Sequence, residues 1–172
     1  MNKLIIPKQI VTADAKRRIL KGYAVEFSHG KISSVKKAEE FDLEFYNGEI
    51  IEQPHLTLIP GFVQTHIHLC QTLFRGLADD LQLLDWLQKK IFPFEQAHNK
   101  HSLRISAKLG ISELLKGGTT TILDMGTLNH QEEIFEELIS SGIRAFSGKC
   151  MIDQNDLFPS FKSSTKDELH SK

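Results

Sequence analysis

Cysteine is scarce in this sequence: Cys70 and Cys150 are the only two among 172 residues. Neither belongs to a CxxC pair, and two cysteines are too few for the disulfide framework of a small secreted protein or for a thiolate zinc cluster. We interpret both as small buried hydrophobic residues. The composition therefore favours a reducing, cytoplasmic setting.

An excess of charge of one sign is also lacking, because 21 lysines and arginines face 22 aspartates and glutamates. A chain without a basic excess has no electrostatic footprint for nucleic acid or for an anionic membrane surface. No window approaches the ~20 apolar residues that a membrane helix needs. Residues 1–10 also lack the apolar core and cleavage site of a signal peptide. We therefore expect no nucleic-acid partner and no membrane partner.

The N-terminal part, residues 1–57, has the pattern of a small all-β unit. Short apolar or alternating runs predict strands at residues 4–11, 23–27 and 32–35. Asn47-Gly48 lies between residues 41–46 and 49–51 and is the strongest short hairpin signal in the chain. We therefore interpret residues 1–57 as one small all-β unit.

The pattern changes at residues 58–172, where strands alternate with helices. Strands are predicted at residues 61–69, 119–123 and 143–151, and a helix at residues 129–141. Between the first two strands, an amphipathic helix around Leu81–Ile91 is expected to stop at Pro93, and a second helix to run from about residue 94 to Lys116. This order is typical of a parallel α/β domain. Residues 154–172 are polar and aperiodic, and we expect a loop or tail there.

The informative motif is His66-Ile67-His68, at the end of the first of these strands. Alternate side chains of a strand share a face, so both imidazoles point the same way. Two neutral imidazole nitrogens on one face can bind one metal ion, at ~2.0–2.1 Å each for zinc. An HxH motif alone is a weak signal. Barrel enzymes, however, place their catalytic groups at the carboxyl ends of strands, which is where this pair lies.

Three segments together resemble the amidohydrolase superfamily: residues 58–68 (LIPGFVQTHIH), residues 72–87 (TLFRGLADDLQLLDWL) and residues 117–125 (GGTTTILDM). Within it they are similar to the branch of S-adenosylhomocysteine/methylthioadenosine deaminases, guanine deaminases and triazine hydrolases. The resemblance implies a (β/α)8 TIM-type barrel beside a β-sandwich, in which residues 1–57 would be one segment and a C-terminal segment absent from this chain the other. Such barrels have eight strands over ~250 residues, and three strands are predicted here. We therefore expect an incomplete barrel, its first strands and helices.

The resemblance also implies site residues. His66 and His68 would be the first two ligands of one divalent metal ion, zinc or, as an alternative, iron. Glu95 would contact the substrate, although a helix N-terminal charge favoured by the helix dipole explains it equally well. Trp86 would line the substrate pocket, with a core aromatic as the alternative. Arg75 is expected in a structural ion pair, with a substrate contact as the alternative. Asp124 is expected to cap the next helix or loop, with a place on the catalytic face as the alternative.

The activity implied is hydrolysis of carbon–nitrogen bonds other than peptide bonds. The resemblance favours an aminohydrolase that deaminates a purine or nucleoside-like heterocycle through metal-activated water. The third and fourth histidines, the aspartate and the acid/base glutamate of such a site belong to later strands, so the catalytic residues here are unknown. We expect this chain alone to be inactive, and the full-length protein to form a homo-oligomer. A non-catalytic remnant or binding module that keeps the scaffold is the alternative, and dechlorination of a triazine remains open.

Overall fold

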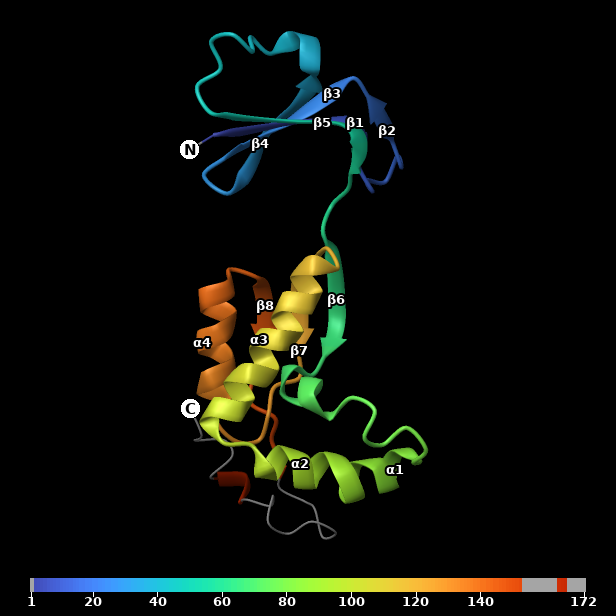
Figure 1. Cartoon of the computed structure of the whole chain (residues 1–172), viewed down its shortest axis with the longest axis vertical. Helices are drawn as coiled ribbons and strands as arrows, with labels where there is room; N and C mark the ends of the chain where they lie inside the picture. Colours follow the sequence, from blue (N-terminus) through green and yellow to red (C-terminus); the bar gives the residue numbers. More distant parts are fainter. Residues whose placement is uncertain (1, 153–163, 167–172) are drawn as a thin grey trace. The chain divides into compact units, whose positions relative to one another are not determined.

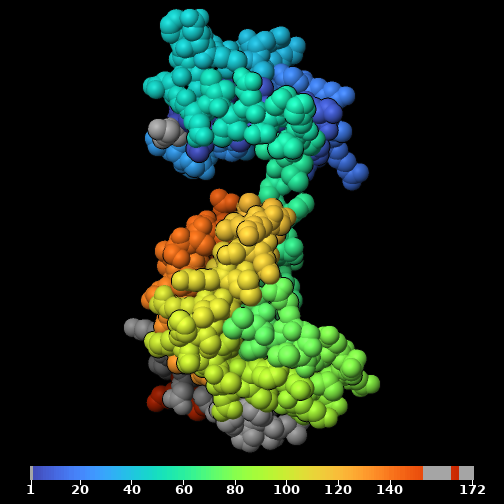
Figure 2. Space-filling model, in the orientation of Figure 1, coloured from blue at the N-terminus to red at the C-terminus, as the bar shows by residue number. Residues whose placement is uncertain are grey.

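The computed structural model describes residues 2–152 and 164–166, so the predicted tail at residues 154–172 lies almost wholly outside the described part. The chain divides into two compact units, Met1–Pro60 and Gly61–Lys172, which are shown in Figure 1 and Figure 2 and are described separately. The division falls three residues after the predicted boundary at residue 57. Among the described helices, none is long and apolar enough to cross a bilayer.

The first unit is a five-stranded sheet. Its strands are β1 (Lys3–Val11), β2 (Ile19–Lys21), β3 (Tyr23–Ser28), β4 (Lys31–Lys37) and β5 (Glu49–Leu58). The order β2-β1-β3-β4 is antiparallel throughout, while β5 pairs with β1 in parallel. Leu4, Ile10, Ala24 and Val25 form its buried apolar residues. The expected completion of this sheet into a β-sandwich stays a prediction.

The predicted hairpin around Asn47-Gly48 is wrong. Residues 41–46 form no strand, and β5 pairs with β1 at the start of the chain, where Lys3 lies opposite Glu49. A two-residue type I′ turn needs positive φ at both central residues, and neither Asn47 nor Gly48 has it. Gly48 serves a close approach instead, because a Cβ there would meet the Asn2 carbonyl oxygen at 2.5 Å.

The second unit contains a parallel sheet of three strands, ordered β6 (Phe62–Ile67), β7 (Thr119–Asp124) and β8 (Arg144–Ser147). The crossover helices α3 (Lys100–Lys116) and α4 (Gln131–Ser141) lie side by side against the sheet (Figure 1). The predicted alternation of strands and helices is confirmed. A buried apolar cluster fills the space between sheet and helices, formed by Leu69, Cys70, Leu103, Ala107, Ile111, Ile122, Ile134, Leu138 and Ile143.

The segment between β6 and α3 differs from the prediction at Pro93. A 3-10 helix, η2 (Leu69–Phe74), follows β6, and then α1 (Leu83–Trp86), the π-helical turn η3 (Leu87–Ile91) and α2 (Phe92–Ala97) run on without a break. In the wider π turn, Phe92 N–H donates to the Leu87 carbonyl five residues back, and Pro93 falls in the first turn of α2. Proline removes one hydrogen bond from a continuous helix, and here that missing bond falls immediately after the wide π turn.

The helical break comes instead at His98-Asn99. Asn99 caps α3 by accepting a hydrogen bond from Ser102 N–H at 2.9 Å. The helix predicted from about residue 94 to Lys116 is therefore two helices, α2 and α3. Its predicted C-terminal end at Gly117 is confirmed.

Candidate metal centre

His66 and His68 lie at the carboxyl end of β6, with His66 exposed and His68 half-buried. Their Nε2 atoms face one another at 3.2 Å, and the two rings are nearly perpendicular, at 80°. A tetrahedral zinc ion with bonds of ~2.0–2.1 Å would separate two donor nitrogens by about 3.3 Å. The Nε2–Nε2 distance therefore matches that between two ligands of one ion.

Burial lowers the pKa of His68, and the neighbouring His66 lowers it further. A lowered pKa favours the neutral imidazole, which is the form that binds a metal. The electrostatics at His68 thus agree with a role as a metal ligand.

A third protein ligand does not join this pair within the part of the chain that the structure describes, because no group of three His, Cys, Asp or Glu side chains there could hold a metal. Asp124, at the end of the neighbouring strand β7, already accepts hydrogen bonds from three other groups through its two carboxylate oxygens. Its Oδ1 accepts from Leu69 N–H at 2.9 Å, and its Oδ2 accepts from Gly126 N–H at 3.1 Å and from Ser147 Oγ at 2.7 Å. The bond from Gly126 N–H is the predicted cap of the loop that follows β7, and the bond from Leu69 N–H, at the first residue of the earlier element η2, was not predicted.

Behind His68 lies a small polar cluster of Gln71, Cys70 and Glu95. Gln71 Nε2 donates to Glu95 Oε1 at 3.0 Å and lies 3.4 Å from His68 Nδ1. Cys70 Sγ lies 3.5 Å from the same Glu95 oxygen. Burial raises the pKa of Glu95, against the two hydrogen bonds, which lower it. Sequence reasoning missed this cluster.

Glu95 is only 8% exposed and is absent from the wall of the pocket described next, with Gln71 standing between it and His68. Because α1, η3 and α2 are continuous, Glu95 lies near the C-terminal end of that helical run, so the helix-dipole alternative, which needs a helix N-terminus, does not apply. Direct substrate contact by Glu95 stays a prediction.

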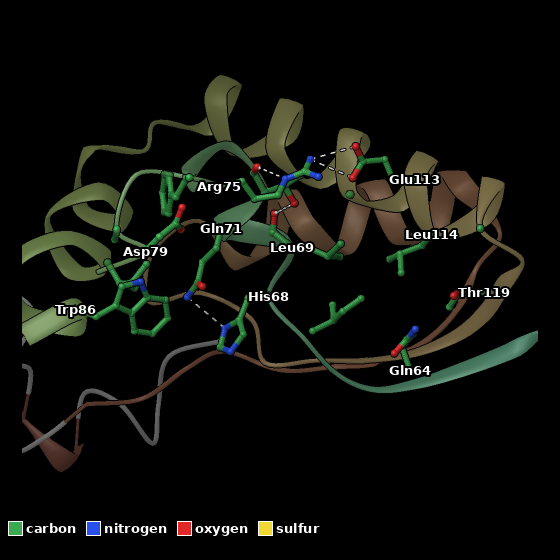
Figure 3. A pocket seen from close by; sticks show the side chains of 18 of the residues that line it. Gln64, His68, Leu69, Gln71, Arg75, Asp79, Trp86, Glu113, Leu114 and Thr119 are labelled. Atoms are coloured by element: carbon green, nitrogen blue, oxygen red, sulfur yellow. Dashed lines mark hydrogen bonds and ion pairs between the residues drawn. The ribbon is translucent and has the colours of Figure 1, made fainter. Parts of the chain in front are cut away.

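An open pocket of about 810 Å³ adjoins His68. Figure 3 shows the side chains of His68, Gln71, Asp79 and Trp86 gathered at one end of it. Trp86 is half-buried and contributes to the wall, as expected if it contacts a substrate. Farther along, Arg75 Nη2 pairs with Glu113 Oε2 at 3.0 Å, which confirms the predicted structural ion pair.

The backbone of η2 is held from several sides. Ser106 Oγ donates to the Leu69 carbonyl at 2.8 Å, and the segments of η2 and α3 lie directly against one another (Figure 2). The His98 ring stacks on Phe74, with its Nε2 2.8 Å from the Cys70 carbonyl. The spacing of Gln71 from His68 could not reveal this contact, because it depends on the 3-10 helix η2, in which side chains at i and i+3 eclipse, and no such helix was predicted.

Comparison with known proteins assigns the class. The amidohydrolase family model matches residues 57–172, so the chain belongs to the amidohydrolase family. It is 37% identical over 146 residues to the 5-methylthioadenosine/S-adenosylhomocysteine deaminase of Caldicellulosiruptor saccharolyticus, covering 84% of this chain and 33% of that protein. The chain thus spans about a third of the length of the curated relatives it matches.

Two solved structures are also similar. An adenosine deaminase from Xanthomonas campestris with bound zinc aligns with a TM-score of 0.85 and 28% identity, covering 97% of this chain and 37% of that one. A guanine deaminase from C. acetobutylicum with bound guanine aligns with a TM-score of 0.81 and 26% identity, covering 98% and 41%.

Proposed function

We propose that this chain supplies the first part of a metal-dependent aminohydrolase that deaminates a purine or nucleoside-like heterocycle. The observation that carries the proposal is the His66–His68 pair, whose facing Nε2 atoms lie 3.2 Å apart at the carboxyl end of β6. In this proposal β6, β7 and β8 are the first three strands of the barrel, and the metal is one divalent ion, zinc most simply.

The chemistry follows from the family and the metal. A divalent ion held by His66 and His68 would supply Lewis-acid activation of water at neutral pH. This chain's own part is to hold the ion through His66 and His68 and to offer a wall for the heterocycle. The Trp86 ring supplies a flat apolar face on that wall, and Gln71 and Asp79 supply polar groups.

The proposed substrate class rests on the relatives, which are named as deaminases of methylthioadenosine, S-adenosylhomocysteine, adenosine and guanine. A catalytic zinc site usually has three protein ligands and a water. Because the described residues supply two, we propose that the 172-residue chain alone does not turn over substrate. Homo-oligomer formation by the whole protein also stays a prediction.

A chimera tests whether the chain carries catalytic machinery or only a scaffold. Residues 1–172 would replace the matching N-terminal third of the C. saccharolyticus deaminase, and ammonia release from methylthioadenosine would be measured. We expect activity in the chimera, its loss in His66→Ala, and no loss in His101→Ala, an exposed histidine on α3. A folded chimera as inactive as its His66→Ala variant would contradict the proposal and favour a non-catalytic remnant.

A further inference from the structure

The helical run between η2 and α3 contains a proline, and the helix widens just before it. α1, η3 and α2 are continuous, and Pro93 lies inside the run, near the start of α2 (Figure 1). In a regular α-helix the Pro93 ring would clash with the carbonyl of Lys89, four residues back, and that carbonyl would lose its donor. Instead, Phe92 N–H donates to the Leu87 carbonyl five residues back. The π turn therefore lies where Pro93 disfavours α-helical bonding.

The wide turn also changes which residues share a face of the helix. At about 100° for each residue, a regular α-helix would place Trp86 and Ile91 on faces about 140° apart. A π turn closes its hydrogen bond over one more residue, so each of its residues advances the helix by less. The π turn thus brings the two faces closer together. Both side chains line the pocket beside His68, and Figure 3 shows the Trp86 ring there.

The two halves of the helical run differ in how firmly they are held. α2 is anchored on η2, because the Phe94 ring packs on the Phe74 ring with 5.1 Å between centroids. Ile91, just before α2, and Glu95, within it, are only 4% and 8% exposed. α1, by contrast, has no buried residue. A change of phase across the π turn would therefore rotate α1, and Trp86 with it, while α2 stays in place.

We propose that Pro93 is a positioning residue for the substrate pocket: it favours the π turn over a regular α-helix, and the turn directs Trp86 toward the pocket beside His68. There the Trp86 ring offers its face to a heterocycle, and nucleic-acid bases of every kind stack on aromatic side chains. The inference rests on the proposed function only in treating this pocket as the place where substrate binds.

A positioning role and a merely tolerated proline predict different results for Pro93→Ala. Alanine restores the N–H donor and favours the α-helix, so the run can wind regularly. If Pro93 is merely tolerated, the Trp86 ring stays where it is. If Pro93 positions Trp86, the ring leaves the pocket although the helix itself becomes more favourable. Exposure of Trp86 together with an unchanged or higher urea unfolding midpoint is therefore the result that identifies the positioning role.

Trp86 is the only tryptophan among the 172 residues, so the tryptophan fluorescence of the chain reports on this side chain alone. The experiment measures the emission maximum and the quenching by acrylamide in the folded 172-residue chain. We expect Pro93→Ala to shift the emission to longer wavelength and to raise the quenching constant toward that of the urea-unfolded chain. Gln96→Ala, at an exposed position of α2 outside the turn, should change neither quantity.

Deletion of Lys89 from the Pro93→Ala variant provides a rescue. At about 100° for each residue, the shortened regular helix places Trp86 and Ile91 about 40° apart, so Trp86 faces the pocket again. Lys89 suits the deletion because its ion pair with Asp85 joins side chains that are 61% and 52% exposed, and such pairs contribute little to stability. We expect the variant with both changes to regain the wild-type emission and quenching.

Wild-type fluorescence in folded Pro93→Ala would overturn the role of Pro93. Exposure of Trp86 that the deletion of Lys89 does not reverse would overturn it too, because general loosening of the helix would then explain the exposure.

Kinetics of the chimera with the C. saccharolyticus deaminase separate this inference from the proposed function. We expect Pro93→Ala to raise KM for methylthioadenosine by about tenfold, within the range that stacking on an aromatic side chain contributes, with a much smaller change in kcat. The deletion of Lys89 should restore KM. A wild-type KM in the Pro93→Ala chimera would overturn the link between Trp86 and substrate. If the fluorescence results hold and the chimera is inactive, the proposed function fails and the effect of Pro93 on Trp86 stands.

Discussion

Gly110, in the middle of α3, decides how closely that helix approaches η2, the element that carries Gln71. In an ordinary helix, Gly→Ala stabilises by about 1 kcal/mol. Here, however, a Cβ at position 110 would meet Thr72 Oγ1 at 2.7 Å and Leu69 Cδ2 at 3.0 Å. Overpacking of this kind costs ~1–3 kcal/mol, so the clash outweighs the gain in helix propensity. We expect Gly110→Ala to lower the free energy of unfolding by about 1 kcal/mol.

The assay is urea unfolding of the 172-residue chain, followed by circular dichroism. Thr72→Ala removes the nearer of the two contacting atoms, so in that background Gly110→Ala should be neutral or stabilising. The coupling between the two substitutions should be about 1 kcal/mol, within the range measured for residues in contact. Stabilisation by Gly110→Ala alone, or additive effects of the two changes, would refute the proposed close packing of α3 on η2.

Other predictions concern the thiol, a glycine and an ion pair of the second unit. Burial raises the pKa of the Cys70 thiol strongly, so iodoacetamide should modify this thiol only when the chain unfolds. Burial of the neutral thiol contributes fully to the free energy of unfolding below the ordinary thiol pKa of about 8.5, and this contribution falls as pH rises above that value. The fall should be absent in Cys70→Ala. Gly126→Ala places a Cβ on the Gly148 carbonyl oxygen at a φ of +79° and should destabilise by more than ~2 kcal/mol in the same urea assay; a wild-type unfolding midpoint would contradict that geometry. Arg75→Ala should change stability by at most about 1 kcal/mol, because both partners of its ion pair with Glu113 are about half exposed; a larger loss would show a role beyond that pair.

Local patterns predicted those elements whose contacts are local. The β-branched run of β7 and the apolar stripe and terminal Gly117 of α3 were sufficient to identify them, because they depend on side-chain periodicity and on a helix stop. The hairpin prediction failed since β5 pairs with β1, some 46 residues away in sequence, as in Lys3 opposite Glu49. Nothing in residues 41–51 alone could reveal that parallel pairing.

In the candidate site, too, the sequence predicted the local arrangement and not the contact between residues far apart in the chain. The HxH spacing predicted that His66 and His68 share a face, and the structure places their Nε2 atoms 3.2 Å apart. Their role as metal ligands stays a prediction. The contact between Gln71 and Glu95 joins residues 24 positions apart. It depends on the continuous course of α1, η3 and α2, which the expected stop at Pro93 had excluded.

The most direct test of the account measures zinc binding to the 172-residue chain at equilibrium, by competition with a weak chelator. We predict weak binding of one zinc ion by the wild type and by His101→Ala, because two imidazoles are fewer than the three protein ligands of a usual zinc site, and strong loss of that binding in His66→Ala, His68→Ala and the double variant. Wild-type zinc affinity in the folded double variant would contradict the account, because the ion would then be held by residues other than the pair at the end of β6.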